Sequence, residues 1–223
     1  MALDFFASGS AAQEHLRAVD RRRTKLEKEW ATPIRTALSA QIRTLSSALE
    51  NGNRIDVPAQ GLFEVLNALY LETGNEFATL ALRSIDKELR KGHTPAHTAA
   101  QQSIDDYIEA TLPSRVGAMN ETTKRIVNGI VVTGRESGFS NSEIAAQLRS
   151  WWKDNAEGRV GGIARTEVLT GTETGIDAAM ATIERQVVHI WTAYLDSETR
   201  PEHAAADGQP QNHGTPFLVG GYP

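Results

Sequence analysis

The polar residues whose spacing could support catalysis or metal binding lie in the second half of the chain. An Asp follows a β-branched segment, with an Arg and a His in the turn after it, and another Arg and a Glu flank a Thr at an expected helix start. Catalytic and metal sites use such positions because strand ends are rigid and loops are accessible. The spacing also fits a structural ion-pair cluster that ties a turn to a helix. The residues concerned are Arg165 and Glu167, then Asp196, Arg200 and His203, and the histidines His189 and His213.

The sequence lacks the motifs of the enzyme classes that could use these residues. A metal hydrolase needs three ligands and a general base, and no HExxH-type helix holds Asp196, His203 and His213 in such an arrangement. No GxSxG nucleophile elbow, P-loop or GxGxxG motif is present. We therefore predict a protein without catalytic activity, metal or cofactor. The open alternative is a metal-dependent hydrolase or a transferase that uses Arg165, Glu167, Asp196 and His203.

Length and composition indicate one core of ordinary size with room for a protruding helical arm. The chain has 223 residues, 40% of them hydrophobic, and it has no Cys, which excludes disulfides and thiolate zinc sites within it. The formal net charge of -5 argues against a protein that coats nucleic acid through its overall field, but it leaves a local basic patch open. No run approaches the roughly 18 apolar residues that span a bilayer. We expect a soluble protein that is made in the cytoplasm and has no membrane contact.

A long amphipathic helix is expected from Ala11 to Glu50, with Pro33 as a kink or restart and Asn51 to Asn53 as its end. Its apolar stripe is longer than a compact body of this size would readily cover, so we predict that part of it packs against another protein chain. The open alternative is packing on the chain's own domain. The stripe is Leu16, Val19, Leu26, Trp30, Ile34, Leu38, Ile42, Leu45 and Leu49, and the expected partner-binding anchors are Leu26, Trp30, Ile34 and Leu38.

Basic residues between these apolar positions leave a third class of function open, a DNA-binding adaptor. Glu27 and Glu29 lie among them in the sequence and would weaken their field, so a solvated helix face is the favoured interpretation. The basic residues are Arg21, Arg22, Arg23, Lys25, Lys28, Arg35 and Arg43.

The remainder of the chain predicts several shorter helices and then a small sheet. Turn signals at Thr73-Gly74, Leu112-Pro113 and 154–162 are expected to separate helices over 62–73, 76–91, 99–110, 121–133 and 163–182. Ser140 to Glu143 has the form of a capping box that starts a further helix. The segment 186–194 is rich in β-branched and aromatic residues and predicts a strand, with Phe217 to Val219 as its candidate partner. The fold class is therefore mainly α with a small β-sheet or hairpin near the C-terminus, built as a long N-terminal helical arm plus a compact C-terminal domain.

Four segments of the second half follow one another in an informative order: Thr123 to Ile130, Gly138 to Leu148, Arg159 to Glu167, and Trp191 to Gly208. In this order and at these separations they resemble the phage head morphogenesis family named for protein F of phage Mu. The family's characteristic positions fall on Arg165, Thr166, Glu167, Trp191, Asp196, Arg200, His203 and Gly208, and we expect these residues to hold the domain together. The resemblance divides the chain into an N-terminal helical arm (1–57), a helical segment (58–112) and a minor head protein domain (113–223).

The resemblance implies a structural minor capsid protein of a tailed bacteriophage. Such a protein is expected in the virion, in the phage head near the portal, and in the host cytoplasm during assembly. Its expected partners are the portal protein and capsid or scaffold components, with multiple copies around the portal and contact with packaged DNA. Its expected roles are procapsid assembly and DNA packaging or delivery.

Two departures from the family pattern bear on metal binding and on the end of the chain. Many relatives carry Cys residues in the turn where Arg200 and His203 stand here. Relatives also continue through a Pro-Gly-Asp turn beyond the point at which this chain stops, Pro223. We expect either a truncated sequence or a branch that has lost this segment.

We predict that folding needs no metal, because a site without thiolates would depend on His and Asp ligands whose spacing here is unconstrained. Adding a chelator should leave the melting temperature unchanged in a calorimetric scan. A large fall in that temperature, restored by zinc, would overturn the prediction.

Overall fold

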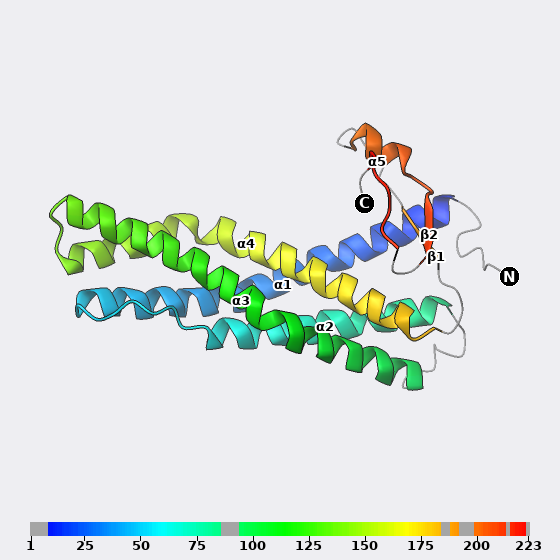
Figure 1. Cartoon of the computed structure of the whole chain (residues 1–223), viewed down its shortest axis with the longest axis horizontal. Helices are drawn as coiled ribbons and strands as arrows, with labels where there is room; N and C mark the ends of the chain where they lie inside the picture. Colours follow the sequence, from blue (N-terminus) through cyan, green and yellow to red (C-terminus); the bar gives the residue numbers. More distant parts are fainter. Residues whose placement is uncertain (1–8, 86–93, 184–187, 192–198, 213–214, 222–223) are drawn as a thin grey trace.

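Four long helices form an elongated antiparallel bundle in the computed structural model, which describes residues 9–85, 94–183, 188–191, 199–212 and 215–221. Successive helices run in opposite directions along the long axis (Figure 1). The mainly α-helical character predicted from the sequence is confirmed. The helices are α1 (Gly9–Glu50), α2 (Gln60–Ile85), α3 (Pro95–Glu136) and α4 (Asn141–Ala181).

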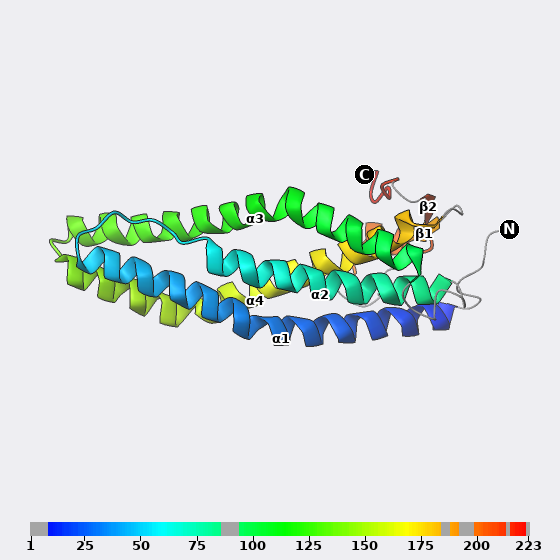
Figure 2. The ribbon, with the colours of Figure 1, turned by 90° about the horizontal axis from the view of Figure 1, so that it is seen from below.

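The two ends of the bundle are built differently. All four helices pack together at the end where α1 begins, and α1, α3 and α4 continue alone at the other end because α2 is shorter (Figure 2). The segment between α1 and α2 runs back along that second end, where Ile55 and Val57 pack against its core. The bundle therefore has a larger four-helix core and a smaller three-helix core. None of the described helices is long and apolar enough to cross a membrane.

The apolar stripe of α1 is covered by the chain itself. Leu26 and Ile34 have no exposed surface, Leu38 is 2% exposed, and Trp30 packs against the same core while partly buried. The prediction that these side chains anchor another protein is therefore wrong for the folded bundle, and the intramolecular alternative holds. The reason is the length of α4: its 41 residues match the 42 residues of α1, which packs chiefly against this helix.

Several turn signals in the sequence lie inside continuous helices. α2 runs through Gly74, α3 runs through Pro113, and α1 runs through Pro33. A proline removes one helical donor and disfavours the turn before it, but apolar contacts on both sides can hold the helix together. Leu112 and Val116, on either side of Pro113, are both buried. The predicted boundary between residues 112 and 113 therefore falls within a single helix that belongs to the bundle.

The predicted end of α1 at Glu50 is confirmed, whereas α3 runs through Gly134 to Glu136, three residues beyond its predicted end. α1 ends before Gly52, which adopts a φ of 66°, and α3 ends before Gly138 with a φ of 75°. The capping box of α4 is also present: the Ser140 hydroxyl accepts a hydrogen bond from the Glu143 backbone at 3.3 Å, and Glu143 accepts one from the Ser140 backbone at 2.7 Å. The Ser140 hydroxyl also donates to the Glu143 carboxylate at 2.7 Å, and this bond, together with the one from the Ser140 backbone, lowers the pKa of the Glu143 carboxyl from its usual value.

The backbones of α2 and α4 approach each other closely where two glycines face one another. A Cβ atom added to Gly175 would lie 2.1 Å from the carbonyl oxygen of Gly74, a separation that real atoms do not adopt. One turn earlier on α4, a Cβ on Gly171 would come within 3.2 Å of the Thr73 side chain. Gly74 thus allows close helix packing instead of ending a helix.

The C-terminal region adds a small lobe with little regular structure. β1 (Val188–Ile190) pairs antiparallel with β2 (Pro210–Asn212), in the register Val188 to Asn212, and the short helix α5 (Pro201–Ala205) lies between them in the sequence. A strand in the predicted region is present but shorter than expected. The described part of this strand, Val188–Ile190, pairs with Pro210–Asn212 and not with the proposed partner, Phe217 to Val219, although Val219 does lie in an isolated β-bridge.

We expect Gly175→Ala to destabilise the bundle, because the new methyl group must push two backbones apart, at a cost of about 2 kcal/mol or more. Gly162→Ala on the same helix is the matched control, since nothing lies within 4 Å of its added Cβ. The control should raise stability by about 0.5–1 kcal/mol through helix propensity. Urea unfolding followed by circular dichroism measures both changes. Equal stabilisation by both substitutions would contradict the close crossing.

Candidate functional site

A buried carboxylate in the middle of α4 is the most unusual polar group of the described structure. Glu167 is 1% exposed and accepts three hydrogen bonds from two other helices. The Arg115 guanidinium on α3 donates from Nε to Oε2 at 3.0 Å and from Nη2 to Oε1 at 2.9 Å, and the Tyr70 hydroxyl on α2 donates to Oε2 at 2.7 Å. This Arg115–Glu167–Tyr70 cluster therefore joins three of the four long helices.

Neighbouring side chains complete the surroundings of the cluster. Arg115 Nη2 also lies 3.3 Å from the Thr170 hydroxyl, and the rings of Tyr70 and Tyr107 stack with their centroids 6.0 Å apart. A carboxylate and a guanidinium match each other in the two-pronged geometry seen here. A buried charge without a partner would be costly in an apolar core. Here the Arg115 guanidinium and the Tyr70 hydroxyl compensate the buried charge of Glu167.

The cluster also fixes the protonation of its two donors. The hydrogen bond to Glu167 raises the pKa of the Arg115 guanidinium above its usual value, although burial acts in the opposite direction. Burial, and then the hydrogen bond to Glu167, raises the pKa of the Tyr70 hydroxyl well above its usual range. Both groups therefore keep their protons and act as donors, and neither is suited to act as a base near neutral pH.

The position of the cluster favours a structural role over a chemical one. A catalytic acid or base must reach a bound substrate, and the Glu167 carboxylate is enclosed by its own hydrogen-bond donors from α2 and α3. The side chain of Glu167 is 2% exposed, and that of Arg115 is 30% exposed. We conclude that the arrangement sets the relative positions of α2, α3 and α4.

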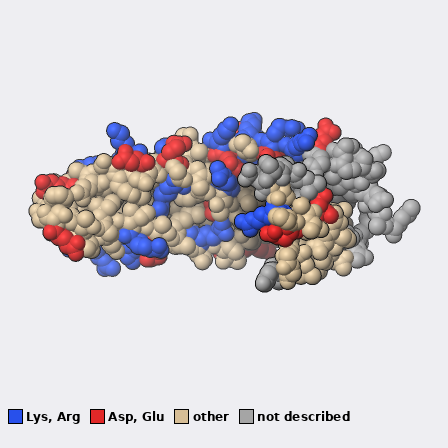
Figure 3. All heavy atoms as spheres, turned by 90° about the horizontal axis from the view of Figure 1, so that it is seen from above, with Lys and Arg blue, Asp and Glu red and all other residues tan. Residues whose placement is uncertain are grey.

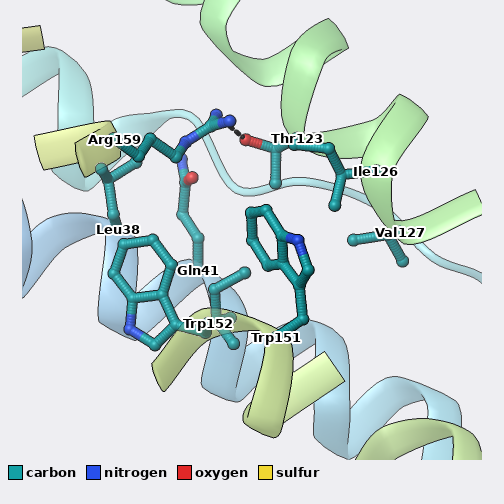
Figure 4. Close-up of a pocket in the computed structure, with 9 residues that line it drawn as sticks. Leu38, Gln41, Thr123, Ile126, Val127, Trp151, Trp152 and Arg159 are labelled. Atoms are coloured by element: carbon teal, nitrogen blue, oxygen red, sulfur yellow. Dashed lines mark hydrogen bonds between the residues drawn. The ribbon is translucent and has the colours of Figure 1, made fainter. Parts of the chain in front are cut away.

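A second buried polar contact lies where α1, α3 and α4 meet. Arg159 Nη2 donates to the Thr123 hydroxyl at 2.7 Å and to the Met119 carbonyl at 3.2 Å (Figure 4). Gln41 on α1 donates to the carbonyl of Pro58 at 2.6 Å and to Asn120 at 3.0 Å. The gap beside these groups leaves no space for a water molecule, so it is a packing defect instead of a binding pocket.

Burial lowers the pKa of the Arg159 guanidinium from its usual value. The hydrogen-bond acceptors that the described structure gives this cation, the Thr123 hydroxyl and the Met119 carbonyl, are neutral. Trp151 and Trp152 lie on the other side of the gap in Figure 4, and the Trp152 indole donates to Ser39 at 3.1 Å. These contacts tie α1 and α3 to α4 at the start of the three-helix end.

The residues predicted around Arg165 and Glu167 are not brought together as expected. Both lie in the middle of α4 and not at a helix start, and Arg165 faces solvent with Nε 3.9 Å from Glu27 Oε2. The hydrogen bonds of Glu167 go to α2 and α3, so its expected contact with the C-terminal turn is wrong. Thr166 is exposed, and its carbonyl accepts a hydrogen bond from Thr170 at 2.9 Å. Asp196 lies outside the described residues, as does His213.

The other predicted positions do meet in the C-terminal lobe. The ring of Trp191 lies 5.5 Å from that of His203 and 5.5 Å from that of Phe217, between centroids. The backbone of Gly208, with a φ of 80°, donates to the Trp191 carbonyl at 2.8 Å. Arg200 is the residue before α5, and its carbonyl accepts from the backbone of His203 at 3.0 Å. Trp191, His203 and Gly208 are thus in contact within the lobe, whereas the described contacts of Arg200 are backbone bonds at the start of α5.

A surface hollow of about 520 Å³ lies beside this lobe, lined mainly by the end of α5 and the glycine turn after it. Its charged lining residues are Glu202 and Asp207. No group of three or more His, Asp or Glu side chains among the described residues is arranged to hold a metal ion. The hollow therefore presents two acidic side chains among mostly small and apolar residues, without a recognisable catalytic arrangement of described side chains.

Sequence reasoning missed Arg115 and Tyr70 because they lie 52 and 97 positions from Glu167. A local signal for the cluster does exist. Arg115 follows the buried Leu112 by three residues, and Glu167 follows the buried Ala164 by three. A charged residue at an apolar position of a helical repeat indicates a buried ion pair, because such a charge is rarely buried alone.

We expect Tyr70→Phe to lower the free energy of unfolding by about 1.5–3 kcal/mol, because it removes a hydrogen bond to a buried charged group. Tyr107→Phe is the matched control: the two rings stack, but the structure shows no hydrogen bond from the Tyr107 hydroxyl to a described residue. That control should change stability by less than about 0.5 kcal/mol. Chemical denaturation of both variants provides the measurement.

A double-mutant cycle sharpens this comparison. In a Glu167→Leu background, the cost of Tyr70→Phe should fall close to zero, since the acceptor has gone. If Tyr70→Phe costs the same in both backgrounds, the hydroxyl does not act through Glu167.

Comparisons with models of protein families, with curated proteins and with solved structures found no match for this chain.

Proposed function

We propose that the chain is a structural minor head protein of a tailed bacteriophage, which works beside the portal during procapsid assembly. The phage assignment is supported by the ordered motifs between Thr123 and Gly208 and their resemblance to the head morphogenesis family. In this proposal the protein is made in the host cytoplasm and becomes part of the virion. Several copies surround the portal and contact capsid or scaffold components.

A structural role is favoured over a catalytic one because the Glu167 carboxylate is buried and hydrogen-bonded within the bundle. Among the polar candidate residues whose burial is described it is the most buried, and Arg115 and Tyr70 hold it inside the bundle. The alternative enzyme would use Arg165 and Glu167 together, yet the first is exposed and the second is sealed in the core. An elongated bundle with buried ion pairs is a suitable spacer or adaptor between larger assemblies.

The docking element in this proposal is an exposed surface, not the apolar stripe of α1. Deleting the residues before Glu50 would remove Leu26, Ile34 and Leu38 from the core, so loss of assembly in such a variant would only report unfolding. Tests of assembly therefore need the full chain.

We expect the full chain to co-purify with the portal protein of its own phage when the two are co-expressed and the portal carries the affinity tag. Quantitative mass spectrometry should give a constant number of chains per portal ring across preparations. The major capsid protein, tagged in the same way and expressed without the portal, is the control and should retain far less. A chain that sediments alone, apart from portal and heads, would contradict the proposal.

A further inference from the structure

The solvent-facing side of α1 is a continuous basic stripe. Six cations are spaced at intervals of three, four, seven or eight residues, which places them on one face of an α-helix, opposite the buried apolar stripe. In the space-filling view, Lys and Arg side chains gather over part of one long edge of the molecule, with some Asp and Glu side chains on the same edge (Figure 3). The stripe is made of Arg17, Arg21, Lys25, Lys28, Arg35 and Arg43.

The acids that seemed to interrupt this stripe in the sequence lie at its edges. Glu27 is 26% exposed and points toward α4, where Arg165 approaches it. Glu29 lies between Arg22 and Lys25, at 3.6 and 3.5 Å. Glu27 therefore lies off the basic face, whereas Glu29 remains beside it and weakens its field locally.

Several other charged residues near the stripe form ion pairs. Arg22 and Arg23 lie off the stripe, paired with Glu76 and Asp20. Within the stripe, Lys25 pairs with Glu29 and Arg35 pairs with Glu157 of α4, and the exposed Glu14 borders one end. Among the described residues, the remaining four cations have no ion-pair partner, and these are Arg17, Arg21, Lys28 and Arg43.

The chemistry of this face fits phosphate groups better than a protein surface. Protein interfaces depend on large apolar or aromatic anchors at their centre. None of the large hydrophobic side chains exposed in the described structure belongs to α1. Apart from Glu29, the exposed residues between the cations are small or carry hydroxyl groups, such as Thr24 and Thr32, which can also donate to phosphate oxygens.

We propose that this stripe of α1 binds the sugar–phosphate backbone of duplex DNA. From Arg17 to Arg43 the helix rises about 39 Å, at 1.5 Å per residue. That length is close to one turn of B-form DNA, about 34–36 Å. The contact is independent of base sequence, because the cations meet phosphates and the helix carries no side chains suited to reading base edges.

The net charge of -5 weakens the overall attraction to DNA but leaves the basic face as the favourable side for contact. A protein that is acidic overall meets DNA productively only through its basic face, so the rest of the surface discourages other orientations. The proposal does not rest on the role at the portal. DNA binding is measured with the isolated chain, so the failure of one proposal leaves the other standing.

The test uses the full chain and a fluorescein-labelled duplex of about 30 base pairs, with binding followed by fluorescence anisotropy at several salt concentrations. The stripe variant is Arg17→Gln, Arg21→Gln and Lys28→Gln combined. The matched control removes three exposed cations outside α1, with Arg54→Gln, Arg125→Gln and Arg135→Gln combined. Both variants change the net charge equally, and circular dichroism verifies that the helix content is unchanged.

We expect the stripe variant to bind at least about 10-fold more weakly at low salt, and the control to bind nearly as well as the unmodified chain. Each phosphate contact contributes about 0.9 to the slope of log affinity against log salt, so the slope should become shallower by about 2.7. No binding by the unmodified chain at about 50 mM salt, or equal losses in both variants, would overturn the proposal. So would polyglutamate that competes as well as duplex DNA at equal charge, because it would identify an acidic protein segment as the partner.

Discussion

A carboxylate buried inside a helical bundle constrains the relative positions of the helices that supply its hydrogen-bond donors. Glu167 can stay buried only if Arg115 and Tyr70 reach it at the same time, and they come from different helices. A shift of any one helix by a single turn would break at least one of these bonds and leave a charge without a partner. The cluster therefore stabilises the observed register of α2, α3 and α4 relative to shifted registers that apolar packing alone would allow.

The close crossing of α2 and α4 lies next to the Arg115–Glu167–Tyr70 cluster. Gly74 lies one turn after Tyr70 on α2, while Gly171 and Gly175 follow Glu167 by one and two turns on α4. Small residues let the two backbones approach, and this approach brings the tyrosine hydroxyl within hydrogen-bond distance of the carboxylate. Packing and electrostatics are thus coupled through a short stretch of two helices.

The sequence predicted where helices begin and end better than it predicted whether a helix continues through a glycine or a proline. Helical periodicity identified α1 and its end at Glu50, and the capping box at Ser140 identified the start of α4. Glycines and prolines were over-interpreted as breaks, because their positions in a packed core could not be known. The site was missed for a related reason: partners separated by 52 and 97 positions are joined only by the fold.

The pairing of the first and last long helices affects how the chain can acquire its structure during synthesis. α1 packs chiefly against α4, which the ribosome completes only after α2 and α3 have emerged. Until then the apolar side chains of α1, with Leu26 and Ile34 among them, have no permanent cover. The nascent chain therefore exposes the apolar face of an amphipathic helix for most of its translation. Chaperones that bind exposed apolar segments are expected to recognise this helix.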